Sequence, residues 1–269
     1  MSNHDTSAEG TPPATLSIRQ LGRQWWRWTR VVLIAGIPVG FIVGGIGSRL
    51  AMFLLRLTSP NSVRGVESDD GFTIGRFTTS GTYNLLQLGA TVGVIGAVAY
   101  LLVRPWLLGP PALRHVTVGL GSGAVVGSML LHADGVDFAL LKPRWFAMGL
   151  FIGLPALFGV VIGVAVERAE RLRVPLGWRQ LIAPVVLLLI GPFSLFATLV
   201  LSPVILLYAG VRFYQAVDPS TDVELRPARS AAGQAVSVGR FAVRAVWLAI
   251  AVAGLVAVIG DIQEISALG

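Results

Sequence analysis

The residues best suited to chemistry lie in a short polar stretch between two apolar runs. His132, Asp134 and Asp137 fall within six residues, and imidazole and carboxylate groups at that spacing can hold a divalent metal ion. Lys142 and Arg144 follow in the same stretch, where their positive charges can neutralise the two carboxylates. We therefore expect a structural network of carboxylate and basic side chains here, with no metal and no cofactor.

A second polar stretch, residues 58–84, carries charges that would reach the same membrane face. Arg49 lies just before it, about 27 Å along a helix that begins at Val31. Its side chain either extends to the headgroups or turns inward to pair with a carboxylate. The network ties the loops to the helix ends or lines an entrance for a small charged solute. Its expected members are Arg49, Asp70, Arg76, Asp134, Asp137, Lys142 and Arg144.

Sequence motifs for catalysis are missing from the chain. It contains no phosphate-binding G-x-x-x-x-G-K-[ST] loop, no G-x-S-x-G elbow and no H-E-x-x-H pair. The absence of cysteine excludes disulfides, thiol catalysis and cysteine-ligated metals. The net charge of +7 comes without base-stacking or basic-helix motifs. The sequence therefore favours a protein that is not an enzyme and does not bind nucleic acid.

The composition is that of a helical membrane protein. Hydrophobic residues make up 54% of the chain, charged residues only 13%, and mean hydropathy is +0.73. Several apolar runs reach the roughly 20 residues that a helix needs to cross a bilayer. We expect an all-α integral membrane bundle of six to seven transmembrane segments. The clearest segments are expected at about 31–55, 82–103, 116–131, 145–166 and 241–259.

The apolar stretch 181–211 has two interpretations. It spans 31 residues and is interrupted at Gly191, Pro192 and Pro203; proline removes a helix hydrogen bond and kinks the helix. The stretch is either one tilted, kinked helix or a hairpin of two broken helices. Lys and Arg collect in cytoplasmic loops, and five arginines lie in 212–244. This charge pattern predicts that the region after residue 211 lies in the cytoplasm. Segment 181–211 must then cross the membrane twice, as a hairpin, and the C-terminus lies outside.

The N-terminal region is polar and then basic and aromatic. Residues 1–17 are expected to be a disordered cytoplasmic tail. Residues 18–30 are expected to form an interfacial amphipathic helix, because tryptophan and arginine favour the headgroup level of the cytoplasmic leaflet. Residues 31–269 would form the transmembrane domain. The expected lipid-interface residues are Arg19, Arg23, Trp25, Trp26, Arg27, Trp28 and Arg30.

Two further patterns predict local structure. Strand-forming residues 72–78 follow the turn signal Asp69-Asp70-Gly71, which predicts a small extracytoplasmic β-hairpin. Glycines recur at a spacing of four residues, which allows membrane helices to approach closely. The glycine pairs and the one triplet are Gly40/Gly44, Gly89/Gly93, Gly119/Gly123/Gly127, Gly149/Gly153 and Gly159/Gly163.

Several short motifs carry a family resemblance over residues 44–173. The segments GSRLAMFLLRL, GFTIGRFTTSGT, YLLVRPWL and DGVDFALLKP, followed by an apolar run and ERAERL, resemble an uncharacterised family of actinobacterial multi-pass membrane proteins. The resemblance implies a bacterial source and an inner-membrane location. It implies no activity. The arginines of residues 18–30 separately predict that the N-terminus lies in the cytoplasm.

The sequence thus supports two kinds of function. The glycine spacing and the scarcity of polar groups within the apolar runs favour a non-catalytic structural or accessory component of a membrane assembly. Its partners would be the lipid bilayer and another membrane protein or a second copy of the chain. The alternative is a small-solute or ion transporter or channel that uses the broken segment 181–211. A membrane-embedded enzyme would need ionisable groups at depth.

Overall fold

The described part of the chain is entirely helical. In the computed structural model, no strand occurs within these residues, and four helices are long and apolar enough to cross a membrane. A helical membrane architecture is therefore supported, whereas a count of six to seven segments is not shown. The predicted β-hairpin strands and segment 181–211 lie outside the described residues. The structure describes residues 18–61, 65, 78–107, 109–131, 140–172 and 228–267.

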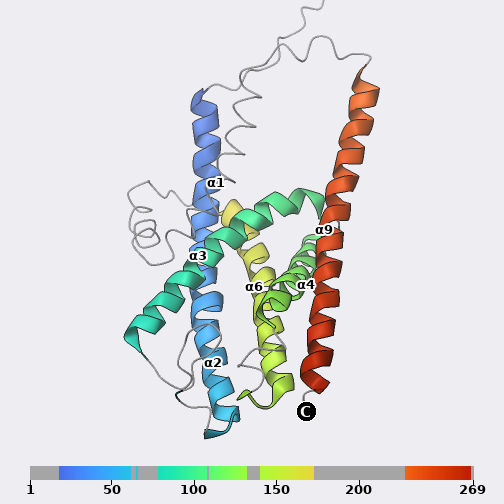
Figure 1. Ribbon diagram of the computed structural model, residues 1–269. Helices are drawn as coiled ribbons and strands as arrows, with labels where there is room; N and C mark the ends of the chain where they lie inside the picture. The colour runs from blue at the N-terminus through green and yellow to red at the C-terminus, as the bar shows by residue number, and fades with distance from the viewer. Residues whose placement is uncertain are drawn as a thin grey trace, which may run out of the picture.

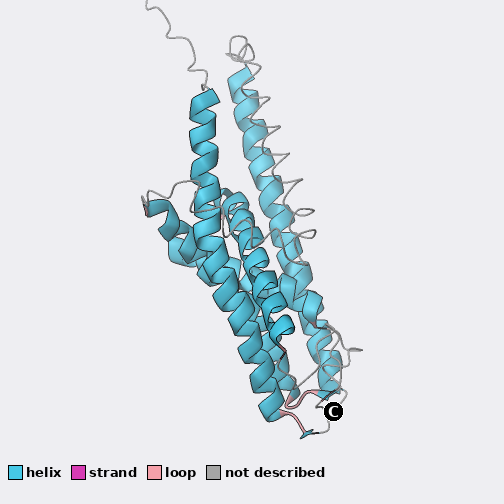
Figure 2. Cartoon of the chain, turned by 90° about the vertical axis from the view of Figure 1, so that its left-hand side faces the viewer, coloured by secondary structure: helices cyan, strands magenta, loops and turns pink. Residues whose placement is uncertain are grey.

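The first candidate span is one continuous helical rod (Figures 1 and 2). It consists of α1 (Ile18–Val39), the π-helical segment η1 (Gly40–Ile46) and α2 (Gly47–Thr58). Residues 18–30, predicted as an interfacial helix, are the first turns of this rod. The π-helical segment was not predicted, although its several glycines suit an irregular, wider turn.

The next helix, α3 (Thr79–Val103), begins three residues before the predicted start. The hydroxyl of Thr78 accepts a hydrogen bond from the backbone N–H of Gly81 at 3.2 Å, which caps the first turn. Residues 79–84 therefore belong to the helix and not to a loop. Arg104–Trp106 form the 3-10 turn η3, and Pro105 ends the α-helix as predicted.

Helices α4 (Pro111–Leu130) and α6 (Arg144–Arg171) follow. α4 covers the predicted third span but is not among the four apolar candidates, because Arg114, His115 and its glycines lower its hydropathy. α6 continues through ERAER, five residues beyond the predicted end of this span at 166. The predicted end was wrong because Ala, Glu and Arg are strong helix formers, and nothing in the segment stops the helix.

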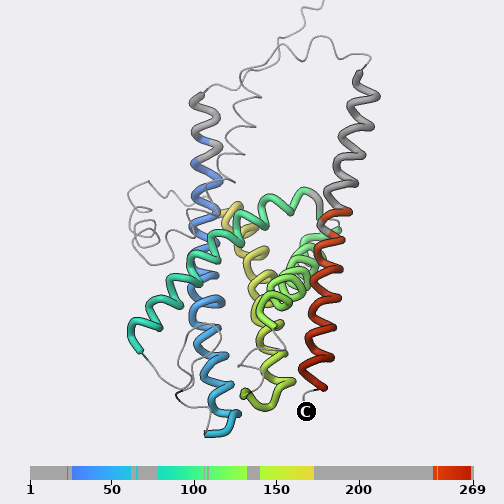
Figure 3. The backbone as a smooth tube through the Cα atoms, in the orientation of Figure 1, coloured from blue at the N-terminus to red at the C-terminus, as the bar shows by residue number. Residues whose placement is uncertain are grey.

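The last described helix, α9 (Ala228–Ala267), runs antiparallel to α6 (Figures 1 and 3). Residues 228–240, predicted as loop, are helical. Near the C-terminal end of α9, the buried Ile265 shares an apolar cluster with Leu55 and Leu131. α9 therefore ends where α2 ends and α6 begins. We call this the opposite end, and we call the end with Val31, Arg104 and Arg171 the basic end.

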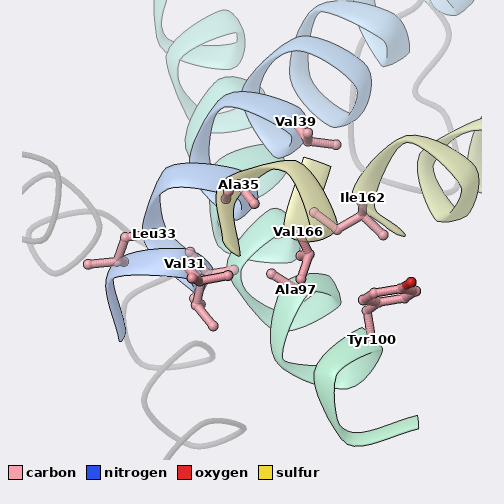
Figure 4. Packing of buried hydrophobic residues seen from close by; sticks show 11 residues of the cluster. Val31, Leu33, Ala35, Val39, Ala97, Tyr100, Ile162 and Val166 are labelled. Carbon is pink, nitrogen blue, oxygen red and sulfur yellow. The ribbon is translucent and has the colours of Figure 1, made fainter. Parts of the chain in front are cut away.

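Glycine brings helix backbones into direct contact. A Cβ on Gly40 would lie 2.1 Å from the carbonyl oxygen of Gly89, and one on Gly93 would lie 2.0 Å from that of Gly36. Real side chains cannot occupy such positions, so η1 and α1 touch α3 through backbone atoms, as the glycine spacing predicted. The same segments contribute to the main apolar cluster with α6 (Figure 4).

Glycine also joins α4 to α6, although not at every predicted position. Gly119, Gly123 and Gly127 are buried, and a Cβ on Gly123 would lie 3.0 Å from that of Ala156. Gly149 and Gly153 were expected to pack in the same way, but a Cβ on either meets no atom of the described residues within 4 Å. They face outward from α6, because a helix presents only part of its surface to its neighbours.

The direction of α9 gives a topology prediction. The chain has no cysteine, so single cysteines report sidedness without background. Ser266→Cys and Ser80→Cys, both exposed near the opposite end, are expected to label from the same membrane face with an impermeant thiol reagent. Ala112→Cys, exposed at the start of α4, should label only after the membrane is opened or from the other face. Labelling of positions 266 and 112 from one face would contradict the observed direction of α9.

Candidate functional site

A polar cluster joins three helices at the basic end. The phenol of Tyr100 on α3 donates a hydrogen bond to Oε1 of Glu167 on α6 at 2.8 Å. Nε2 of His115 on α4 lies 3.4 Å from the same carboxylate oxygen, a distance suited to an ion pair when the imidazole is protonated. One carboxylate therefore contacts both other helices.

An ion pair lies one turn further along the same helices. Nη1 of Arg104 bonds to Oε2 of Glu170, and the side chains keep 31% and 18% of their surface exposed. The side chains of His115 and Glu167 are each only 13% exposed. Solvent exposure thus increases from the side chains of His115 and Glu167 to that of Arg104. Electrostatic interactions are stronger where less solvent is present.

Helix geometry explains why these side chains meet. Tyr100 and Arg104 are four residues apart, and Glu167 and Glu170 are three apart, so each pair shares a helix face. Gly163 lies one turn before Glu167, and a Cβ there would be 2.8 Å from Cδ2 of His115. The absent side chain lets the Tyr100 and His115 rings approach to 6.3 Å between centroids.

The groups in this cluster can hold helices together or exchange a proton among phenol, imidazole and carboxylate. No group of three potential metal ligands occurs within the described residues. The long central parts of the described helices contain no Asp, Glu, Lys, Arg or His, so the ionisable groups gather near helix ends. These central parts are 31–48, 84–99, 116–131, 146–166 and 245–260.

Comparison of the chain with protein families, curated proteins and solved structures finds no match. The Tyr100–His115–Glu167 contacts and the Arg104–Glu170 pair bring five ionisable side chains together at the basic end.

The described members of the predicted charge network, Arg49, Lys142 and Arg144, lie at the opposite end. The guanidinium of Arg49 points toward the first turn of α3, since a Cβ on Gly81 would be 3.1 Å from its Nη2. The backbone N–H of Lys142 donates to the hydroxyl of Ser59 at 3.0 Å, while its side chain is exposed. Arg144 begins α6 and is half-buried. Asp70, Arg76, Asp134 and Asp137 lie outside the described residues.

Other predicted site residues are described in part. Gly191, Pro192 and Pro203 of the expected broken helix lie outside the described ranges. Arg19 and Trp25 lie on α1, as predicted for the lipid-interface segment. Within that segment the exposed side chains are Arg23 and Arg27, and the half-buried ones are Trp26, Trp28 and Arg30.

Sequence reasoning missed the cluster at the basic end. The predicted span 145–166 ended before Glu167 and Glu170, so neither carboxylate was placed on a helix facing Tyr100. A signal was present, because extending α6 to Arg171 places Gly163, Glu167 and Glu170 on one face. Opposite charge at Arg104 and His115 then gives those carboxylates natural partners.

Proposed function

We propose that the chain is a non-catalytic structural or accessory component of a membrane assembly in a bacterial inner membrane, with the basic end in the cytoplasm. The observation that carries this proposal is the backbone contact between η1 and α3 at Gly40 and Gly89. Helices held at such short separation form a rigid unit, because interiors packed without voids deform little. A rigid bundle suits a scaffold better than a carrier that must change shape.

The position of ionisable groups supports the same function. Transport coupling and intramembrane catalysis use charged or nucleophilic groups at membrane depth, and the central parts of the described helices have none that ionise at neutral pH. The polar contacts around Glu167 then hold α3, α4 and α6 together near their ends.

Helix α9 offers a surface for a partner. Ala249, Ala253 and Ala257 recur at a spacing of four residues, and all three are exposed. Small residues at this spacing allow another membrane helix to approach. On the same helix, Leu248 and Val256 are 67% and 64% exposed, an arrangement that favours an apolar neighbour.

The test is site-specific photo-crosslinking in intact cells, followed by extraction in a mild detergent. A photoreactive residue at Ala253 is expected to yield a protein adduct of discrete mass. The matched control is Leu120 on α4, which is 68% exposed and should yield lipid adducts only. A single partnerless species on native electrophoresis, together with lipid adducts alone at both positions, would contradict the proposal.

The alternative function is transport of a small charged solute, and Arg49 favours it. Its guanidinium lies against the first turn of α3, where an anion would find a positive charge. In proteoliposomes this alternative predicts a flux that Arg49→Ala abolishes. Glu264→Gln, which removes a charge from an exposed side chain at the same end, should leave that flux intact. Absence of flux across a broad panel of ions and small solutes would remove it.

A further inference from the structure

Two neighbouring helices carry exposed arginines at the basic end. α1 enters the main apolar cluster at Val31, and α6 leaves the same cluster at Ala169. Arg27 precedes Val31 by one turn, about 6 Å along the helix axis. Arg168 and Arg171 flank Ala169. Arg27 therefore lies just beyond the shared apolar cluster, Arg168 and Arg171 lie at the edge of that cluster, and Arg23 lies about one further turn out along α1.

These arginines keep their charge uncompensated within the described part of the chain. The carboxylates described at this end are Glu167 and Glu170, and both are already engaged with Tyr100, His115 or Arg104. Among the described residues, neither an ion-pair partner nor a side-chain hydrogen-bond partner is found for four exposed arginines. These four are Arg23, Arg27, Arg168 and Arg171.

These arginines lie where the headgroup region of a membrane is expected, at the boundary between apolar and polar side chains. Trp26 packs against the apolar cluster, and Trp28 is half-buried on the same helix. Tryptophan concentrates at the membrane–water interface, so Arg27 between them would lie among lipid headgroups. Guanidinium groups bind phosphate oxygens with two parallel hydrogen bonds.

We propose that Arg23 and Arg27 of α1 together with Arg168 and Arg171 of α6 form a two-helix binding site for the phosphate headgroups of anionic phospholipids. The site extends beyond the interfacial segment 18–30, because α6 supplies half of its charge. It does not depend on the structural or transport role of the protein. An acidic protein or nucleic acid would not require arginines aligned with tryptophans at the apolar boundary.

The test measures lipid retention by native mass spectrometry of the full chain in a neutral detergent. Phosphatidylglycerol and phosphatidylcholine with identical acyl chains are added at equal concentration. The wild-type protein is expected to retain phosphatidylglycerol preferentially, and Arg168→Gln/Arg171→Gln should lower that retention about thirtyfold, as two basic residues near a charged surface would. Arg23→Gln/Arg27→Gln should give a loss of similar size.

Three controls separate this site from general charge effects. Lys142→Gln removes an exposed positive charge at the opposite end and should leave retention unchanged. Arg168→Lys/Arg171→Lys keeps the charge and should retain part of the preference, which also shows that this part of α6 tolerates substitution. An unchanged thermal unfolding midpoint in the glutamine variants shows that the fold is intact.

Several outcomes would overturn the proposal. Equal retention of the two lipids would exclude headgroup recognition. Loss confined to the α1 variants would reduce the site to the interfacial segment alone. Displacement of phosphatidylglycerol by excess inorganic phosphate would show that the arginines recognise free phosphate and not a lipid.

Discussion

Gly93→Ala is expected to lower the free energy of unfolding by about 3 kcal/mol or to prevent recovery of folded protein. The added methyl group would lie 2.0 Å from the carbonyl oxygen of Gly36 and 2.7 Å from the Cα of Gly40. Both obstacles are backbone atoms, so no rotamer change relieves the clash and the helices must separate. The measurement is thermal unfolding in detergent, with the monodisperse fraction after size-exclusion chromatography.

Two further glycine substitutions calibrate this result. Gly149→Ala on α6 adds the same methyl group where no atom lies within 4 Å, and we expect a change below about 0.5 kcal/mol. Gly123→Ala meets the Cβ of Ala156 at 3.0 Å and should cost about 1 kcal/mol. If all three variants unfolded at one temperature, backbone contact would not be what holds these helices together.

Glu167→Ala is expected to destabilise the protein by about 3 kcal/mol, because one substitution leaves two buried groups without their partner. The Tyr100 hydroxyl loses its acceptor at 2.8 Å, and His115 loses the carboxylate at 3.4 Å. Glu167→Gln keeps an acceptor for the hydroxyl and should cost only about 1 kcal/mol. The measurement is the unfolding midpoint and the free energy derived from denaturant titration.

A double-mutant cycle tests whether α3 and α6 are coupled through this carboxylate. Tyr100→Phe and Glu167→Ala should be non-additive by more than about 0.5 kcal/mol, as contacting residues are. Glu264→Ala removes an exposed carboxylate from α9 and serves as the matched control, with little expected change. Additive effects, or a control as costly as Glu167→Ala, would show that the cluster does not lock the helices.

Helix positions followed well from the apolar runs, whereas helix ends did not. The end of α3 at Val103 was predicted because Pro105 stops a helix. The ends of α6 at Arg171 and the start of α9 at Ala228 were missed. Charged and small residues beyond an apolar run can either extend the helix or form a loop, and hydropathy does not distinguish these two outcomes.

The spacing of glycines predicted close packing but not its direction. Gly89 and Gly149 have the same four-residue pattern, yet Gly89 contacts backbone while Gly149 meets no atom within 4 Å. A repeat of four places residues on one helix face without saying which helix, if any, lies against that face. The partner of each glycine row is settled only when the helices are assembled.

The sequence alone was sufficient to predict an apolar, cysteine-free, helical chain whose charges lie near helix ends, because each of these properties depends on neighbouring residues only. The meeting of Tyr100 with Glu167, which are 67 residues apart, depends on how three helices cross. So does the alignment of Arg27 with Arg168, which requires α1 and α6 to share one apolar cluster. Helix crossing is fixed by packing between distant segments, and that information lies in the tertiary structure.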